Sequence, residues 1–101
     1  MEHATDENFN ELTNKGLVLV DFYATWCGPC QMLKRELEEL DGDKRFKIVK
    51  VDVDEAEQTA NRFNIDAVPN VFLLSNGKVV NSFMGYRTAE DIQGWLLPHL
   101  K

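Results

Sequence analysis

Residues 17–40 read LVLVDFYATWCGPCQMLKRELEEL, and this stretch decides the fold. Its first part, Leu17–Tyr23, is an almost continuous apolar run interrupted by one acid, which is typical of a strand covered on both faces. Beyond the two cysteines, apolar residues recur on one helical face, at Cys30, Leu33, Leu37 and Leu40. The stretch therefore predicts a buried strand, a loop with two cysteines and an amphipathic helix that ends near Gly42.

Further strands and helices are predicted after this stretch. Residues 46–53 are rich in β-branched side chains and predict a second strand. Residues 54–57 resemble a capping box and are expected to start a helix. Apolar runs at 71–74 and 79–83 flank Asn76-Gly77, which is a strong signal for a type I′ turn between antiparallel strands.

Both ends of the chain are predicted to carry a helix. Thr5 or Asp6 is expected to cap a short first helix that ends at Gly16. Thr88 starts the last helix, and Pro98 loosens its final turn. Strands and helices that alternate and are followed by a hairpin and a helix predict an α/β fold, a three-layer sandwich with a central mixed β-sheet flanked by helices.

The composition agrees with one domain spanning residues 1–101. The chain is 44% hydrophobic and 28% charged, and a chain of this length buries enough core to need no metal or disulfide staple. Its 11 Lys and Arg against 17 Asp and Glu give a net charge of −6, the wrong sign for binding nucleic acid or an anionic membrane surface. No apolar run is long enough to span a membrane. Residues 1–7 show no export or import signal, so the cytoplasm is the expected compartment.

The two cysteines lie three positions apart in Cys27-Gly28-Pro29-Cys30. Pro29 suits the start of a helix, because the N–H that it lacks would have no partner there. Cys27 is therefore expected at the helix N-terminus, where unpaired N–H groups and the helix dipole stabilise a thiolate. Such a thiolate can attack a substrate disulfide, and Cys30, which is expected to be more buried, can release the product by forming a disulfide with Cys27.

Two other interpretations of the cysteine pair are weaker. Zinc sites use the same spacing but usually need four ligands, and the other candidates, His3 and His99, lie at opposite ends of the chain. An inert buried pair would not need Gly28 and Pro29 at a helix start. The sequence thus favours redox chemistry and predicts no metal site.

Residues 20–30, which contain Trp26-Cys27-Gly28-Pro29-Cys30, closely resemble the active-site signature of thioredoxins. The resemblance continues in order along almost the whole chain, through residues 50–54, 65–69 and 72–77 and through Gly85 before the last helix. It implies the thioredoxin fold and a protein dithiol:disulfide oxidoreductase that reduces disulfides in client proteins.

The resemblance also implies how the protein is recycled. No bound cofactor is expected, because the cysteine pair itself carries two electrons. A thioredoxin reductase that uses FAD and NADPH, or a related ferredoxin-linked system, would restore the dithiol. We expect the protein to act as a monomer.

Asp21 is the predicted proton-transfer residue, and Lys50 is predicted to support it by modulating its charge. Asp21 shares a strand face with Leu17 and Leu19, so its carboxylate is expected to be desolvated and its neutral form favoured. By resemblance, Asp21 matches the buried aspartate that assists deprotonation of the second cysteine, here Cys30, and Lys50 matches the lysine near that aspartate. From the residues alone, Asp21 could instead be a strand-end acid bonded to backbone, and Lys50 a solvated strand lysine.

Trp26, Val68, Pro69 and Gly85 are the predicted substrate-binding residues. An aromatic side chain beside the nucleophile suits a contact surface for a partner chain. In thioredoxins the proline that matches Pro69 is cis and lies against the cysteines, which leaves the preceding backbone free to pair with an extended substrate, and the matching glycine borders the same groove. From the residues alone, Pro69 could be an ordinary strand-start proline and Gly85 a simple turn.

Three features depart from the family pattern. Tyr23 stands where many thioredoxins carry tryptophan and is expected to pack beneath the active-site loop. Residues 32–37 lack the proline that kinks the active-site helix in many members, so a straighter helix is expected. Asn70 follows Pro69 where threonine is commoner, which alters the edge of the groove and with it the partner preference.

Two alternative functions stay open at the level of sequence. A disulfide oxidant or isomerase uses the same fold, although Gly28-Pro29 argues against it, because oxidising relatives typically place histidine between the cysteines. The chain could also be a protein-binding module whose Trp26, Val68 and Gly85 surface works independently of redox chemistry.

Overall fold

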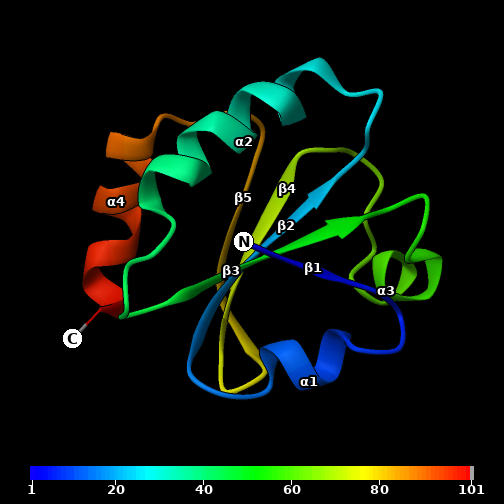
Figure 1. Cartoon of the computed structure of the whole chain (residues 1–101), viewed down its shortest axis with the longest axis horizontal. Coiled ribbons are helices and arrows are strands. Elements are labelled where there is room, and N and C mark those ends of the chain that lie inside the picture. Colours follow the sequence, from blue (N-terminus) through cyan, green and yellow to red (C-terminus); the bar gives the residue numbers. More distant parts are fainter. Residues whose placement is uncertain (101) are drawn as a thin grey trace.

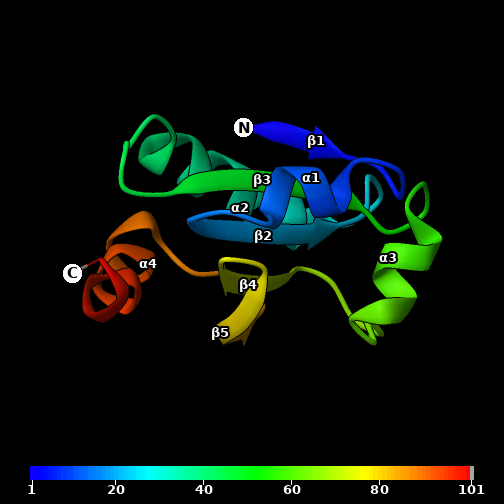
Figure 2. The ribbon, with the colours of Figure 1, turned by 90° about the horizontal axis from the view of Figure 1, so that it is seen from below.

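A mixed sheet of five strands forms the centre of the computed structural model, which describes residues 1–100. The strands are ordered β1-β3-β2-β4-β5, and Figure 2 shows them in this order from top to bottom. β1, β3 and β2 run parallel, whereas β4 is antiparallel to both β2 and β5. The strands are β1 Glu2–Ala4, β2 Leu17–Tyr23, β3 Lys47–Asp52, β4 Asn70–Ser75 and β5 Lys78–Met84.

Helices cover both faces of this sheet (Figure 1). On one face, α2 (Gly28–Leu40) and α4 (Ala89–Leu96) bury a cluster that includes Leu33, Leu37, Ile92 and Leu96. On the other face, the cluster beneath α1 (Phe9–Thr13) and α3 (Glu57–Arg62) includes Phe9, Val20, Phe22 and Phe63. The predicted three-layer α/β sandwich is confirmed.

β2 is the central strand of the sheet. Residues 18–22 are all buried, because β3 and β4 pair with its two edges and helices cover both faces. Asp21 is the one charged residue of this strand and lies between Lys50 of β3 and Val71 of β4. Since side chains alternate along a strand, Asp21 shares with Leu19 the face that α2 covers.

The predicted hairpin joins β4 to β5. Asn76 and Gly77 have φ values of 49° and 84°, and a type I′ turn requires positive φ at both central positions. Farther along the hairpin, Leu73 pairs with Asn81 and Leu74 pairs with Val79. Val80 is therefore an extra residue that makes a β-bulge in β5.

The prediction of a cap at Thr5 holds in part, because Thr5 Oγ1 accepts the N–H of Asn8 and its carbonyl oxygen accepts the N–H of Phe9 at the turn into α1. Two other predicted helix caps are wrong. Asp6 does not cap α1, because its carboxylate accepts hydrogen bonds from the N–H groups of Gln58 and Thr59 at the start of α3. The capping box expected at residues 54–57 does not form, because α3 begins after Ala56, which has no side-chain acceptor. A residue more than fifty positions away in sequence supplies the cap instead.

The ends of the other helices follow the sequence more closely. The hydroxyl of Thr88 accepts a hydrogen bond from the N–H of Asp91 at the start of α4. A 3-10 turn at Leu97–His99, which contains Pro98, follows that helix. Gly42 has φ +97° just beyond α2, where the chain must turn away. The sequence does not predict β1, because its three residues carry no strand pattern of their own and form a strand only by pairing with β3.

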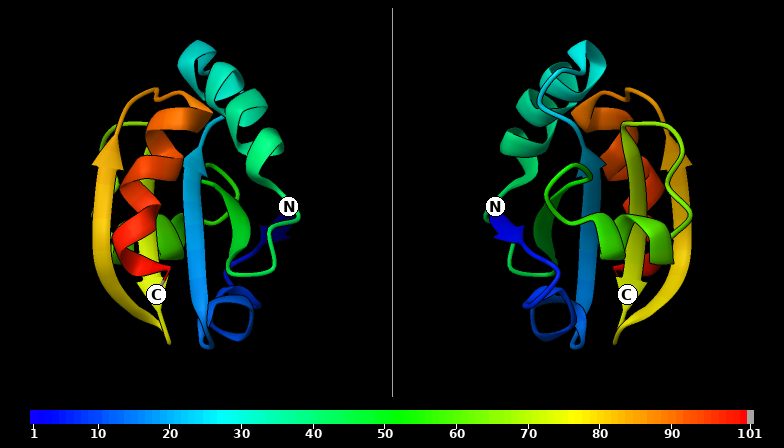
Figure 3. Two further views of the ribbon diagram at one scale, coloured as in Figure 1. Left: turned by 90° about the vertical axis from the view of Figure 1, so that its left-hand side faces the viewer. Right: turned by 90° about the vertical axis from the view of Figure 1, so that its right-hand side faces the viewer.

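The order of elements places the cysteines at one end of the sheet. α2 begins just beyond the carboxyl end of β2, whereas α1 lies near the opposite end of that strand (Figure 3). Residues 24–27 connect β2 to α2. The cysteine pair therefore lies at the junction between the central strand β2 and the start of α2.

Candidate functional site

Cys27 and Cys30 form a disulfide at the start of α2. Cys27 is the N-cap residue, and its Sγ accepts a hydrogen bond from the N–H of Cys30 at 3.2 Å. Both cysteines are buried, with 6% and 3% of their surface exposed, in a small cluster with Ala24. The helix N-terminus thus presents a backbone donor to the sulfur of Cys27, and such a donor stabilises a thiolate.

The loop that leads into β4 lies against this disulfide. The peptide bond between Val68 and Pro69 is cis, and the carbonyl oxygen of Val68 is 3.8 Å from Cys27 Sγ. Gly85 donates its N–H to the carbonyl oxygen of Pro69 at 2.9 Å and has φ +85°, a conformation that favours glycine. The structure therefore brings together Cys27, Val68, Pro69 and Gly85, as the resemblance to thioredoxins implies.

The backbone next to the cis bond is open to a partner. In the part of the chain that the structure describes, the N–H and C=O groups of Asp66, Ala67 and Val68 make no hydrogen bond with another backbone group. Asp66 and Ala67 are exposed, and Val68 is half-buried. An extended segment laid along these residues could satisfy their polar groups.

Trp26 stands beside the cysteines and exposes 72% of its surface. Its ring Nε1 donates a hydrogen bond to Asp54 Oδ2 at 3.0 Å, which fixes the indole above the end of β3. The indole forms one wall of a pocket of about 140 Å³, whose other lining residues are Val53, Ile65, Asp66, Ala67 and Val68. The predicted substrate-binding residues Trp26 and Val68 thus share one hollow beside Cys27.

Asp21 is fully buried, and neither of its carboxyl oxygens has a hydrogen-bond partner. Burial raises the pKa of Asp21 to about 7, although the positive charge of Lys50 acts in the opposite direction. The alternative of a strand-end acid bonded to backbone is therefore wrong. A carboxyl with this pKa can both give and take a proton near neutral pH.

Lys50 is buried as well, so the alternative of a solvated strand lysine is wrong. Its ammonium nitrogen lies 4.1 Å from the centre of the Tyr23 ring. Burial lowers the pKa of Lys50, and the charge of Asp21 opposes that shift. Tyr23 packs against the cluster that holds the two cysteines, which confirms its predicted place beneath the loop.

Sequence reasoning missed part of the pocket. Asp54 was expected in a helix cap, but its carboxylate binds Trp26 across 28 positions of sequence. Val53, Ile65 and Asp66 line the pocket although none of them stood out as a functional residue. The one available signal was their position within or next to the segments that resemble thioredoxins.

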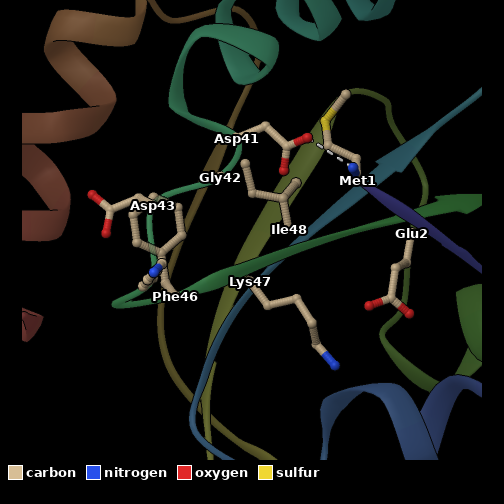
Figure 4. A pocket seen from close by; sticks show the side chains of 9 residues that line it. Met1, Glu2, Asp41, Gly42, Asp43, Phe46, Lys47 and Ile48 are labelled. Atoms are coloured by element: carbon tan, nitrogen blue, oxygen red, sulfur yellow. Dashed lines mark hydrogen bonds and ion pairs between the residues drawn. The ribbon is translucent and has the colours of Figure 1, made fainter.

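A second pocket, of about 280 Å³, lies at the other end of α2 (Figure 4). Met1, Asp41 and Phe46 are among its lining residues, and the ammonium group of Met1 lies 2.8 Å from Asp41 Oδ2. No cysteine borders this pocket. This pocket is thus separate from the cysteine site.

Residues 1–100 contain neither a candidate metal cluster nor a candidate membrane-spanning helix. No group of three or more His, Cys, Asp or Glu side chains within that range is placed to hold a metal ion. In the same residues, every helix falls short of the length and apolar character that a membrane crossing needs.

The fold and the site together define a thiol–disulfide oxidoreductase, with a redox-active cysteine pair at a helix N-terminus of an α/β sandwich. The family model described as Thioredoxin matches residues 1–97. The chain belongs to the thioredoxin family, and it is a protein-disulfide reductase of that type.

Bacterial relatives named thioredoxin share close to half of the sequence. The chain is 45% identical to the thioredoxin of Bacillus subtilis over 100 residues, which cover 96% of this chain and 95% of the relative. It is 43% identical to the thioredoxin of Staphylococcus haemolyticus over 98 residues, with 95% and 94% covered. For the thioredoxin of Listeria monocytogenes the identity is 42% over 94 residues, with 91% of each chain covered. The predicted family and oxidoreductase function are confirmed.

Proposed function

We propose that Cys27 is the attacking cysteine and Cys30 the resolving cysteine in the reduction of client disulfides. The observation that carries this assignment is the N-cap position of Cys27, whose sulfur accepts the N–H of Cys30. Positive helix ends and backbone donors lower the pKa of a thiol, so Cys27 is the better nucleophile. Cys30 lies inside the first turn and meets the client after Cys27 has reacted.

The reaction then runs in two exchange steps. The Cys27 thiolate attacks one sulfur of the client disulfide, that S–S bond breaks, and the other client sulfur leaves as a thiolate. Cys30, as a thiolate, then attacks the sulfur of Cys27, the mixed disulfide breaks, and the second client sulfur leaves. The client gains two electrons and, with two protons, becomes a dithiol. The chain is left with the disulfide between Cys27 and Cys30.

Asp21 is the group that we assign to proton transfer from Cys30. It lies on the face of the sheet that α2 covers, and burial raises its pKa to about 7. The Asp21 carboxylate can therefore take the proton of the Cys30 thiol as the second step begins. Lys50, next to Asp21 on β3, tunes the charge of that carboxylate.

The client segment is proposed to lie along residues 66–68. Within residues 1–100, they make no hydrogen bond with another backbone group, which favours pairing with an extended chain. Trp26 lines a pocket with them, and Gly85 binds the carbonyl oxygen of the adjacent Pro69. Gly28 and Pro29 shape the first turn between the two cysteines.

A separate reductant must restore the dithiol. We assign this role to a thioredoxin reductase that uses NADPH and FAD, or to a related ferredoxin-linked system, because the family relatives imply such a partner. NADPH and FAD are used by that reductase, whereas Cys27 and Cys30 carry the electrons in this chain. We further propose that residues 1–101 act as one monomeric domain in a reducing cytoplasm.

Serine variants of the two cysteines test the assignment of roles. We expect Cys27→Ser to reduce a disulfide client no faster than dithiothreitol alone, because no thiolate remains at the N-cap. We expect Cys30→Ser to accumulate a covalent complex with the client, visible on a non-reducing gel and released by added thiol. Accumulation of the complex in Cys27→Ser in place of Cys30→Ser would reverse the two roles.

The reduction potential separates reductase from oxidant. Thioredoxins have a potential of about −270 mV and protein disulfide isomerase about −180 mV. Equilibration of the Cys27–Cys30 pair with a dithiol buffer is expected to give a value near the first. A value near the second indicates an oxidant or isomerase.

A different test addresses the alternative of a redox-independent binding module. A cellular role that survives in the double serine variant of Cys27 and Cys30 indicates such a module.

A further inference from the structure

The pocket of about 140 Å³ lies directly beside the reactive sulfur. Two of its lining residues flank Cys27, since Trp26 precedes it and the carbonyl oxygen of Val68 lies 3.8 Å from its Sγ. Any segment that brings a disulfide to Cys27 and pairs with the free backbone of residues 66–68 therefore passes over this pocket.

The pocket combines apolar walls with negative charge. Asp66 is the one charged residue among those that line it, and it is exposed. A second carboxylate, Asp54, is held against the pocket wall by its hydrogen bond to Trp26. Within residues 1–100, neither Asp54 nor Asp66 has a salt-bridge partner.

Three basic side chains of neighbouring segments contact aromatic rings, and the first of them, Lys50, lies over Tyr23. Arg62, at the end of α3, donates to Asn10 Oδ1, and its guanidinium lies 5.4 Å from the centre of the Phe9 ring. Arg87, beyond Gly85, lies 4.5 Å from the centre of the Phe83 ring. The negative charge beside Cys27 is thus left for a bound segment to meet.

The spacing along the free backbone indicates which client residue meets that charge. Asp66 lies two positions before Val68, in a segment that bends at residues 67–69. In an extended client chain beside it, side chains two positions apart lie on one face. When a client cysteine lies opposite Val68, the client residue two positions away lies opposite Asp66.

We propose that Asp66, assisted by Asp54, selects client disulfides in which a lysine or arginine lies two residues from the attacked cysteine. The proposal rests on the attack by Cys27 and on the client path along residues 66–68 that are proposed above. Opposite charges raise the rate of productive encounter, and an acidic residue at the same client position is repelled. The occupant of the pocket is therefore an extended, basic segment of a client protein.

Symmetrical disulfide-linked peptide dimers test the proposal. Two series carry Lys, Gln or Glu either two positions before or two positions after the cysteine. Each dimer is mixed with the fully reduced protein, and the second-order rate constant is measured from acid-quenched samples. Only the series whose variable residue lies opposite Asp66 should show a preference. In that series, we expect the Lys peptide to react about fivefold faster than the Glu peptide, and 1 M salt to remove most of that preference.

A matched pair of variants assigns the preference to the pocket. We expect the ratio of the Lys to the Glu rate to fall to about twofold in Asp66→Asn, since Asp54 remains. Glu11→Gln removes the same charge from exposed α1, near the opposite end of β2, and is expected to keep the wild-type ratio.

Three results would count against the proposal. Equal Lys and Glu rates in both series, or an unchanged ratio in Asp66→Asn, show that Asp66 does not select clients. An equal fall in Glu11→Gln shows that net charge, and not the pocket, sets the preference. If the neutral Gln peptides are not reduced at all by the wild-type protein, the proposed attack of Cys27 on client disulfides itself fails.

Discussion

At the scale of single residues, the buried carboxyl of Asp21 links stability to pH. Its pKa is about 7 in the folded protein, whereas an aspartate in an unfolded chain has a pKa of about 4. Between these two values the folded state keeps a proton that the unfolded state has lost. Stability therefore falls as the pH rises through this window, by as much as about 4 kcal/mol, and no further above it.

Replacing this carboxyl with an amide isolates its contribution. We expect Asp21→Asn to match the wild-type free energy of unfolding near pH 4 and to exceed it by up to about 4 kcal/mol at pH 8, because the amide cannot ionise. Urea titrations of both oxidised proteins at several pH values measure the difference. A difference that does not change with pH would show that Asp21 is not the group that titrates.

At the scale of helices and strands, Glu36 connects α2 to α4. Its Oε1 accepts a hydrogen bond at 2.8 Å from the N–H of Ala89, the first residue of α4. That N–H has no partner within its own helix, and negative charge is favourable at a helix N-terminus. We expect Glu36→Ala to lower the free energy of unfolding by about 1 kcal/mol, measured in urea.

Two control variants separate this contact from a loss of surface charge. Glu36→Gln keeps the acceptor and is expected to lose less stability than Glu36→Ala. Glu38→Ala changes an exposed glutamate on the same helix and is expected to leave stability nearly unchanged. If Glu36→Ala and Glu38→Ala behave alike, the contact with Ala89 does not stabilise α4.

The sequence could predict elements whose signals are local. β2, α2 and the hairpin at Asn76-Gly77 follow from apolar periodicity and turn chemistry within a few residues. β1 could not be predicted, because three residues become a strand through pairing with β3. The cap of α3 was equally inaccessible, since Asp6 reaches Thr59 from 53 positions away.

The same limit applies to the site. The cysteine pair and its helix start are encoded in consecutive residues, and the resemblance to thioredoxins added Val68, Pro69 and Gly85. Side chains that meet only in the folded chain, such as Trp26 and Asp54, carried no local signal. The acidic pocket beside Cys27 is therefore a result of the structure.

At the scale of the whole molecule, the disulfide lies outside the two large hydrophobic clusters of the core. The large clusters on the two faces of the sheet contain neither cysteine. Cys27 and Cys30 are three positions apart, and so short a loop constrains the unfolded chain by no more than about 2 kcal/mol. We expect the reduced protein to unfold cooperatively in urea, with a loss of stability within that bound.

The double variant Cys27→Ser, Cys30→Ser provides the control, because it cannot form the disulfide under any buffer condition. Its unfolding curve should resemble that of the reduced wild-type protein. Loss of cooperative unfolding in either sample would show that the disulfide holds the core together.

The bulge at Val80 has a consequence for how the protein behaves at high concentration. β5 is an outer strand, and a regular outer strand offers a continuous row of free N–H and C=O groups on which another chain can assemble. The extra residue breaks the spacing of that row and increases the local twist. The bulge at Val80 thus works against the pairing of β5 with another chain and against self-association into fibrils.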